Sequence, residues 1–433
     1  MVRAVFFILV GFALAFMVST AASQDSDSRQ RFRAVNPDSS LAGYRNPTIA
    51  GPGSAEGTLE FDSQEKKSQK GILPVRLMAP WYAKKAQINE RYGLQFGLNY
   101  QLVYAWASAG ITPESETQSA SGVVNIPISW TPIGRNSRNK GTFTIAFENR
   151  HVYGFDVSPQ NLAFETGTIL PTAVKFGDVP FRVLVMHYYQ ALFDGRFGFV
   201  VGKIAADDYF SHHQLMHPFL NYLGFGSIIS PSGNWINPGF GIAAGVAIKQ
   251  QFFIKAGLLD ADGDPFNNSE VFDFGNDFWD GRFTSIVEAG WAPSHDERYA
   301  KRAAITAWHT DPHDSFEEGY GVAFAGNWTV GERWVPILLA GASNGKGISV
   351  LAERTLTLGL GYNFAHHDVF GSSFNWTRPP GGLRDQYTTE LYYRFYLSER
   401  MAFTPNIQWV INPSLNTAES SMIYLQIRAR FDV

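Results

Sequence analysis

The sequence predicts an all-β protein, a transmembrane antiparallel β-barrel of about 16 strands with a short helical or disordered N-terminal extension. The first observation is a recurring alternation of apolar and polar residues, which puts the two kinds on opposite faces of a strand. The second is an apolar export signal at the N-terminus. The third is that no later apolar run approaches the roughly 20 residues that a membrane-spanning helix needs. A closed barrel with lipid outside and water inside accounts for all three.

Residues 1–23 have the organisation of a secretory signal peptide. A positive start at Met1–Arg3 precedes an apolar run from Ala4 to Val18 and the small residues Ser19–Ser23. This order of charged, apolar and small residues is typical of a cleaved export signal. We therefore expect cleavage near Ala22–Gln24.

Two further segments precede the predicted barrel. Residues 24–77 are rich in Ser, Asp, Gly, Pro and Gln and show no periodicity, so we expect them to be disordered or loosely attached. Residues 78–91 place Trp81, Lys84 and Ile88 at helical spacing after Pro80, which predicts a short periplasmic helix. Residues 92–433 form the predicted barrel.

Alternation of apolar and polar residues then recurs along the rest of the chain. In Arg354–Phe364, for example, Leu356, Leu358 and Leu360 alternate with threonines and glycines. The strands predicted in this way are Tyr92–Trp106, the stretches around Val124–Trp130 and Phe143–Phe147, Phe181–Phe193, Arg196–Ala205, Pro238–Ile248, Gln251–Leu259, Arg282–Trp291, Ala303–His309, Gly321–Val330, Trp334–Ala342, Arg354–Phe364, Asp368–Trp376, Tyr387–Leu397, Met401–Ile411 and Ser421–Val433. In Arg196–Ala205, Lys203 falls in phase with Phe199 and Val201, which predicts either a bulge or a change of phase at this point.

Three long irregular stretches separate the strands. They are Val152–Asp178, Tyr209–Asn237 and Asp260–Gly281, which we interpret as long outer loops, one of them able to fold inward. Aromatic residues at strand ends are typical of the girdles at a membrane interface. A soluble β-sandwich or propeller would also give alternating strands, but no blade repeat is visible.

Composition argues against several functions. The formal net charge is −4, which is no electrostatic footprint for nucleic acid. The chain contains no cysteine, so its stability does not rest on disulfides. No Gly-x-Ser-x-Gly elbow is present. We expect no catalytic residue, cofactor or metal.

Charged residues on the polar side of the strands are the main candidates for function. On a lipid-facing surface an Arg or Lys would cost about 2–4 kcal/mol at the bilayer midplane, so we expect these charges to face the lumen. There they either hydrate and brace the wall or line a constriction that exchanges hydrogen bonds with sugar hydroxyls. The residues in this phase are Glu148, Arg150, Glu288, Glu390, Arg394, Arg428 and Arg430.

Three other motifs carry weaker signals. Asp260–Asp264 resembles the start of a calcium loop, but the glycine and the final acidic residue are misplaced, so a polar turn is favoured over a calcium site. His212, His213 and His217 share a loop without an acidic partner, which favours a solvated loop over a metal site. Gly239-Phe240-Gly241 lacks the third glycine of a dinucleotide fingerprint.

Several runs resemble the carbohydrate-selective porin (OprB) family. They are Tyr189–Tyr209 (YQALFDGRFGFVVGKIAADDY), Phe252–Pro265 (FFIKAGLLDADGDP) and, most specifically, Thr389–Ser414 (TELYYRFYLSERMAFTPNIQWVINPS). The resemblance implies a sixteen-stranded channel in the outer membrane of a Gram-negative bacterium, for passive uptake of glucose and similar sugars. The positions that its motifs mark as notable are Asp194, Lys203, Asp207, Asp208, Glu390, Arg394 and Gln408.

We therefore expect a sugar-admitting porin whose partners are small sugars and outer-membrane lipid, without nucleic acid. A general or anion-preferring porin on the same scaffold is the alternative, and a secreted or outer-membrane carbohydrate-active enzyme is a third hypothesis. Monomer and homotrimer both remain open.

Overall fold

The computed structural model describes residues 49–63, 78–248, 251–261, 276–294, 297–331, 333–364, 367–398 and 400–433. The predicted signal peptide and most of residues 24–77 lie outside the described residues. So does the Asp260–Asp264 turn beyond Ala261. Among the described residues, no helix has the length and apolar character needed to cross a membrane.

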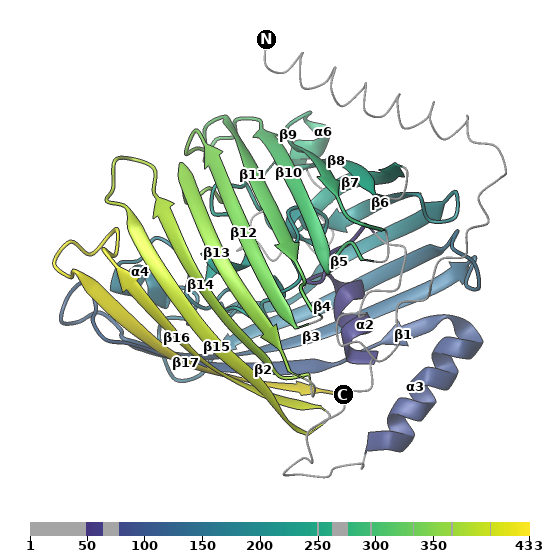
Figure 1. Ribbon diagram of the computed structural model, residues 1–433, viewed down its shortest axis with the longest axis horizontal. Helices are drawn as coiled ribbons and strands as arrows, with labels where there is room; N and C mark the ends of the chain where they lie inside the picture. Colours follow the sequence, from purple (N-terminus) through teal and green to yellow (C-terminus); the bar gives the residue numbers. More distant parts are fainter. Residues whose placement is uncertain are drawn as a thin grey trace.

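The described chain forms a closed antiparallel β-barrel of sixteen strands, as the alternation predicts (Figure 1). Each strand pairs with its neighbour in sequence, and β17 closes the ring on β2 with Arg428 opposite Val103. The short strand β1 (Leu94–Phe96) pairs with β3 and continues the line of β2. The ring consists of β2 (Asn99–Ala107), β3 (Gln118–Ile133), β4 (Gly141–Val152), β5 (Val179–Leu192), β6 (Phe197–Ile204), β7 (Gly239–Ile248), β8 (Phe252–Asp260), β9 (Phe283–Trp291), β10 (Lys301–Thr310), β11 (Gly319–Trp328), β12 (Trp334–Ser343), β13 (Arg354–Asn363), β14 (Val369–Arg378), β15 (Gln386–Ser398), β16 (Met401–Ile411) and β17 (Ser421–Asp432).

The connections differ in length at the two ends of the barrel. After β4 and β6 the chain runs through 153–178 and 205–238 before the next strand, whereas β5–β6 and β7–β8 are joined by 193–196 and 249–251. In barrels of this kind the long loops are extracellular and the short turns periplasmic. We use those two names for the ends from here on.

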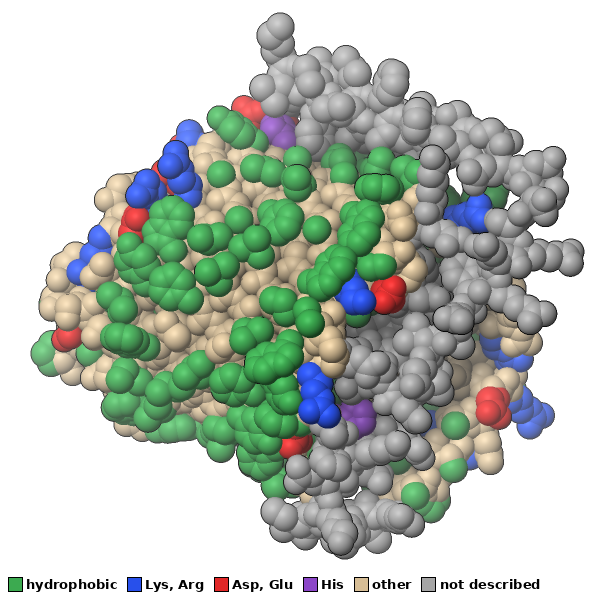
Figure 2. Space-filling view, in the orientation of Figure 1, with side chains coloured by type: hydrophobic (Ala, Val, Ile, Leu, Met, Phe, Trp, Pro, Cys, Tyr) green, Lys and Arg blue, Asp and Glu red, His purple; other side chains and the backbone are tan. Residues whose placement is uncertain are grey.

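The outer face of the barrel is apolar, as predicted. On β13, Leu356 and Leu358 are exposed, while Thr355 and Thr357 are buried on the lumenal side. In Figure 2 the wall that faces the viewer carries hydrophobic side chains over most of its width, and charged side chains lie at its margins. Aromatic residues sit near the strand ends, where Trp291 and Trp328 stack at 5.4 Å between ring centroids. This surface suits a hydrocarbon environment with interfacial aromatic rings.

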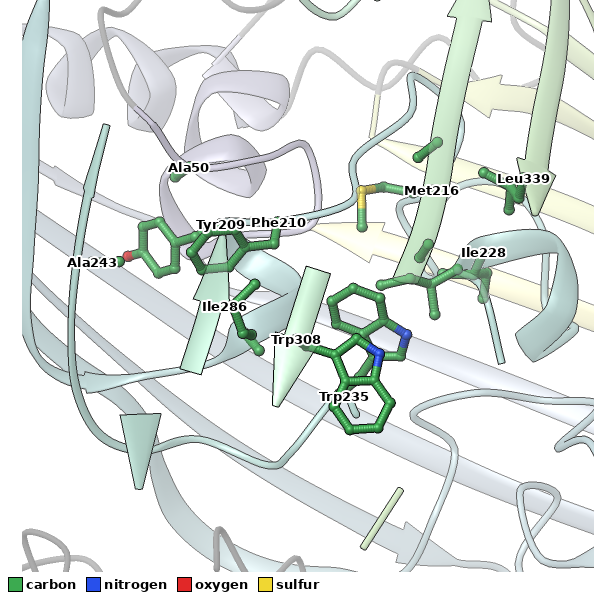
Figure 3. Packing of buried hydrophobic residues seen from close by; sticks show 14 of the residues in the cluster. Ala50, Tyr209, Phe210, Met216, Ile228, Trp235, Ala243, Ile286, Trp308 and Leu339 are labelled. Carbon is green, nitrogen blue, oxygen red and sulfur yellow. The ribbon is translucent and has the colours of Figure 1, made fainter. Parts of the chain in front are cut away.

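Residues 205–238 fold into the barrel together with the last part of 153–178, whose Phe176 packs with Phe219 and with Val103 of the wall. Nearly all of residues 205–238 are buried, including the short helices η2 (Ala206–Asp208) and α5 (Phe225–Ile228). Figure 3 shows Met216, Ile228 and Trp235 packed against Trp308 and Leu339 of the wall. Burial of this apolar surface stabilises the inward fold. The lumenal face of β12, with Ile337 and Leu339, is apolar for the same reason, and this explains its weak alternation in sequence.

The N-terminal segment is a second element inside the barrel. Residues 49–63 were expected to be loosely attached, but they run within the ring and include helix α2 (Ala55–Ser63) (Figure 1). Ser54 begins the helix because its Oγ accepts a hydrogen bond from Gly57 N at 3.0 Å. The polar, aperiodic composition of residues 24–77 gives no signal for this short helix.

Helix α3 (Ala79–Tyr92) lies where the short helix is predicted and stands outside the ring in Figure 1. It has a proline in its first turn and ends at Gly93, whose φ of +69° is the left-handed conformation of a helix C-cap. Tyr82 Oη donates to Asp432 O at 3.0 Å and so ties the helix to the end of β17. Helix α4 (Leu162–Thr166) lies in the 153–178 loop, and α6 (Asn276–Trp279) precedes β9.

The irregularity predicted around Lys203 lies in the backbone of Gly202, where φ is +136°. The pairing of β5 with β6 continues through Met186 and Lys203 without a register shift, so no bulge forms there. The unusual φ of Gly202 changes the direction of the next side chain. Lys203 is accordingly buried even though it is in phase with the half-exposed Phe199 and Val201.

Candidate functional site

Most of the predicted lumenal charges bind the segments folded into the barrel. Glu390, on β15, accepts hydrogen bonds from Leu223 N at 2.6 Å, from Gly224 N at 3.2 Å and from Asn406 Nδ2 at 2.6 Å. Gln408, on the adjacent β16, donates from Nε2 to Thr172 O at 2.7 Å. These wall side chains satisfy main-chain groups of the 205–238 and 153–178 loops, which would otherwise be buried without partners.

Two lumenal arginines hold the in-folded loop mainly by its main-chain carbonyl groups. Arg428 donates from Nη1 to Pro218 O at 2.5 Å and from Nη2 to Asn221 O at 3.0 Å. Arg394 donates from Nη1 to Leu220 O at 3.2 Å and to Asn221 Oδ1 at 3.1 Å. A guanidinium carries several donors in a fixed fork, which suits it to hold a loop by its carbonyl groups.

On the opposite wall, Glu288 is the centre of a buried charge cluster. It lies 3.1 Å from Lys255 Nζ and 2.9 Å from Arg302 Nη2, and it accepts hydrogen bonds from Thr306 Oγ1 at 3.0 Å and Ser211 N at 2.6 Å. The cluster therefore joins β8, β9 and β10 to the in-folded loop. One carboxylate against two cations is electrostatically satisfied within the wall.

The last arginine of the predicted set holds the N-terminal segment. Arg430 Nη2 contacts both carboxylate oxygens of Asp62, at 2.8 and 2.9 Å. Its Nη1 lies 2.8 Å from Asp432 of the same strand. Arg430 therefore anchors α2 to β17.

Glu148 belongs to a separate cluster, in which charged side chains pair with one another rather than with main-chain groups of a loop. Glu148 Oε1 accepts from Arg150 Nε at 2.8 Å and from Arg182 Nη2 at 2.9 Å. Its second oxygen, Oε2, is buried and accepts no hydrogen bond from the described residues. Nearby, Lys175 and Asp207 form an ion pair at 3.7 Å, and both side chains are partly accessible, at 21% and 30%. Glu148 thus pairs with side chains of the wall, whereas Lys175 and Asp207 join the 153–178 loop to the in-folded loop.

Asp208 lies beside this cluster on η2 and is buried. Burial, reinforced by the neighbouring charge of Asp207, raises the pKa of Asp208 to about 7. Its main-chain oxygen accepts a hydrogen bond from Gly51 N at 2.6 Å. Asp208 can therefore change its charge near neutral pH inside the barrel.

One predicted position does not belong to the lumen. Asp194 is exposed in the periplasmic turn between β5 and β6, with a φ of +58°, and its main-chain N–H donates to Asn139 Oδ1 at 2.8 Å. Aspartate tolerates this left-handed conformation better than most residues, which accounts for an Asp-Gly turn at this point. Its role here is to form the turn, so the prediction of a pore-lining position for Asp194 is wrong.

The expectation of a solvated histidine loop is also wrong. His212, His213 and His217 are all buried inside the barrel. Burial lowers the pKa of His213 to about 4, and its Nε2 donates to Ile228 O at 2.8 Å. The Nδ1 of His217 accepts a hydrogen bond from Phe219 N, and its Nε2 lies 3.2 Å from Thr58 Oγ1 of α2. No group of three or more candidate metal ligands occurs among the described residues.

Several lumenal residues were not predicted from the sequence. Arg182, Lys255 and Arg302 each pair with a predicted glutamate. The signal for Arg182 is in the strand register, because it stands directly opposite Glu148 across β4 and β5. Lys175 and His187 carry no comparable signal, since their partners come from the in-folded loop and from α2.

The comparisons with known proteins agree with this architecture. A family model described as the carbohydrate-selective porin, OprB family, matches residues 134–356 and 361–432. The high-pH structure of Pseudomonas putida OprB is similar, with a TM-score of 0.64, 15% identity, and coverage of 82% of this chain and 97% of that chain. The low-pH structure of the same protein gives a TM-score of 0.48 at 14% identity, covering 85% of this chain and 99% of that one. A mutant porin of Rh. blastica gives 0.47 at 12% identity, with 78% and 100% covered.

No curated protein matches the chain at a significant level. The high-pH structure of Pseudomonas putida OprB, at 15% identity, supports the fold alone, whereas the family model covers more than half of the chain. Channels of this kind are not enzymes, and they act in the outer membrane of Gram-negative bacteria. The chain belongs to the OprB family of carbohydrate-selective porins.

Proposed function

We propose that glucose and similar small neutral sugars diffuse down their gradient through this barrel, past the side-chain cluster of Glu148, Arg150, Arg182, Lys175 and Asp207. The observation that carries the proposal is the contrast between two kinds of lumenal charge. Glu288, Glu390, Arg394, Arg428 and Arg430 are engaged with in-folded segments. In the Glu148 cluster, by contrast, Glu148 pairs with wall side chains and keeps one carboxylate oxygen without a hydrogen bond from the described residues, and the ion pair of Lys175 and Asp207, which joins two loops, is partly accessible.

The chemistry of this cluster suits a polyol. Carboxylates accept hydrogen bonds from sugar hydroxyls, and guanidinium or ammonium groups donate to the hydroxyl oxygens. Because opposite charges already compensate each other, a neutral solute can exchange hydrogen bonds there without a net change of charge. Binding must stay weak for solute to leave as fast as it enters.

The test is liposome swelling with purified protein. We expect faster swelling in glucose than in a charged solute of similar size, and equal rates would refute the selectivity. Single-channel current titrated with glucose measures the contact itself. Neutralising the carboxylate in Glu148→Gln should raise the half-blocking concentration about tenfold, the effect of losing a hydrogen bond worth about 1.4 kcal/mol.

Reversal potential in a salt gradient separates this proposal from the general or anion-preferring porin. A selective sugar channel with compensated charges should show weak ion preference. A strong anion preference, together with equal swelling in all solutes of one size, would favour the alternative.

The export route and assembly belong to the same proposal. Residues 1–23 direct export and are removed near Ala22–Gln24, residues 78–91 lie in the periplasm, and 92–433 insert as the barrel. N-terminal sequencing of protein from outer membranes checks the cleavage site. Light scattering in detergent distinguishes a monomer from a homotrimer.

A further inference from the structure

We propose that residues 49–63 form a displaceable plug, which narrows the periplasmic end of the channel when seated and moves aside to give full conductance. This inference rests on the proposed function, because it concerns the path of the same solute. The segment is named the N-terminal plug below.

The N-terminal plug crosses the lumen between distant parts of the wall. At one end, Ile49 meets Gly245 of β7, and Tyr299 of the β9–β10 turn donates a hydrogen bond to Ala50 O. At the other end, Asp62 pairs with Arg430 of β17, and its main-chain oxygen accepts from Arg400 Nη1 at 2.5 Å. Tyr299 and Arg400 belong to periplasmic turns, so the plug lies at that end of the barrel.

Between its two ends the plug is attached mainly by polar contacts. Glu56 Oε1 lies 2.7 Å from His187 Nε2 on β5, and Thr58 Oγ1 lies 3.2 Å from His217 Nε2 of the in-folded loop. Burial alone would raise the pKa of Glu56, but the charge and hydrogen bond of His187 outweigh it, and the pKa lies below its ordinary value. Leu59 is the plug's main buried large aliphatic side chain and packs near Gly97. Contacts of this kind can be exchanged for water.

The seated plug leaves polar groups without hydrogen bonds from the described residues. Near Arg430, Gln101 Oε1 and Asn99 Nδ2 are buried and unsatisfied. The Nδ1 of His187 is in the same state. A buried polar group without a partner is costly, and water in an open lumen would satisfy each of these groups. The seated arrangement is thus opposed by the hydration that opening would restore.

These contacts assign the plug a role in selecting solutes by size. While seated, it is joined to the in-folded loop, since Gly51 N donates to Asp208 O of that loop, and the two narrow the lumen together. When it moves aside, the loop alone limits the channel. Glu56 and Asp62 set the equilibrium between the seated and the displaced plug, because their carboxylates pair with side chains of the wall.

The test is a reversible cross-link in the full chain, which has no cysteine of its own. A Cβ placed on Gly245 would lie 2.9 Å from Ile49 Cγ2. Since Cγ2 is one bond from Cβ, the two Cβ atoms of an Ile49→Cys/Gly245→Cys variant lie at most about 4.4 Å apart, within disulfide range. We expect the reduced variant to conduct KCl like the wild type and the oxidised variant to lose most of that conductance. Equal conductance with the cross-link verified by mass spectrometry would overturn the proposal.

A second variant tests release rather than locking. Glu56→Gln/Asp62→Asn removes both plug carboxylates and should raise the open-to-closed ratio by about tenfold to a hundredfold for each charge-assisted hydrogen bond that is lost. The matched control is Asp385→Asn, which removes a carboxylate paired with Arg378 at 3.0 Å outside the lumen and should leave gating unchanged. If the plug variant and the control gate alike, the plug assignment is wrong.

The two readouts separate this inference from the proposed function. If KCl conductance follows the redox state but the channel shows no preference for glucose, the plug proposal is supported and the proposed sugar selectivity is refuted. Glucose selectivity that ignores the redox state would do the reverse.

Discussion

The anchoring of the in-folded loop by Glu390 makes a quantitative prediction. Truncation in Glu390→Ala removes the acceptor for Leu223 N, at 2.6 Å, and for Gly224 N, at 3.2 Å, and leaves both N–H groups buried. A hydrogen bond to a charged group contributes about 1.5–3 kcal/mol, so two such bonds hold this part of the loop by about 3–6 kcal/mol. The equilibrium constant between docked and undocked states of residues 223–224 should then fall by a factor of roughly 10² to 10⁴.

The rest of the loop keeps its anchors in this variant, so we expect a local widening rather than collapse. Arg428 still holds Pro218, and the apolar cluster around Trp235 is untouched. Permeation of a disaccharide should rise strongly, while that of glucose changes little, because only the larger solute is limited by the loop's position.

Liposome swelling with both sugars measures this ratio, and heat-modifiable mobility on a gel shows that the barrel has assembled. Glu390→Gln is the matched control, since its amide oxygen can still accept one of the two main-chain hydrogen bonds and should give an intermediate ratio. An assembled Glu390→Ala barrel with the wild-type ratio of disaccharide to glucose would show that this anchor does not set the channel width.

Three other predictions concern single sites. The pKa of Asp208 is raised to about 7, so its carboxylate loses its negative charge as pH falls from 8 to 6. The reversal potential of the wild type should therefore shift toward anion preference over this range. The shift should be much smaller in Asp208→Asn, which has no carboxylate to titrate. By linkage the same group should make the protein less stable as pH rises from about 4 to 7, because only the folded state retains the proton in this range; thermal unfolding of wild type and Asp208→Asn across it measures the difference. On the outer face, Leu358→Arg should cost about 2–4 kcal/mol of stability in lipid, whereas Leu358→Phe should be tolerated; equal unfolding midpoints in urea would contradict a membrane-embedded face.

The strands could be predicted from the sequence because their signal is local. Alternation such as that of Thr357 and Leu358 depends only on the two-residue period of a strand and on which side meets lipid. The same phase placed Glu390 and Arg428 in the lumen. What these side chains hold could not be predicted, since Leu223 and Pro218 come from a loop far away in sequence that carries no periodic signal.

The errors have the same origin. His212, His213 and His217 were expected to be solvated because their stretch was taken for an outer loop, yet this stretch becomes a core once it lies inside a ring of strands. Residues 49–63 were expected to be loosely attached because the stretch 24–77 is polar and shows no periodicity, and contacts with the lumen supply the stability that this composition does not. In both cases the closed wall provides a surface that no local window contains.

The pairing of β2 with β17 has a consequence for assembly. The other neighbours in the ring are also neighbours along the chain, so their contacts are comparatively local and can form as successive hairpins. At this seam residues near 99–107 must find residues near 424–432, and the entropy of joining them is the largest in the molecule. Until that step the sheet has two bare edges with unpaired main-chain groups, which lipid cannot satisfy. We therefore expect closure of this seam to be the slow event in barrel biogenesis.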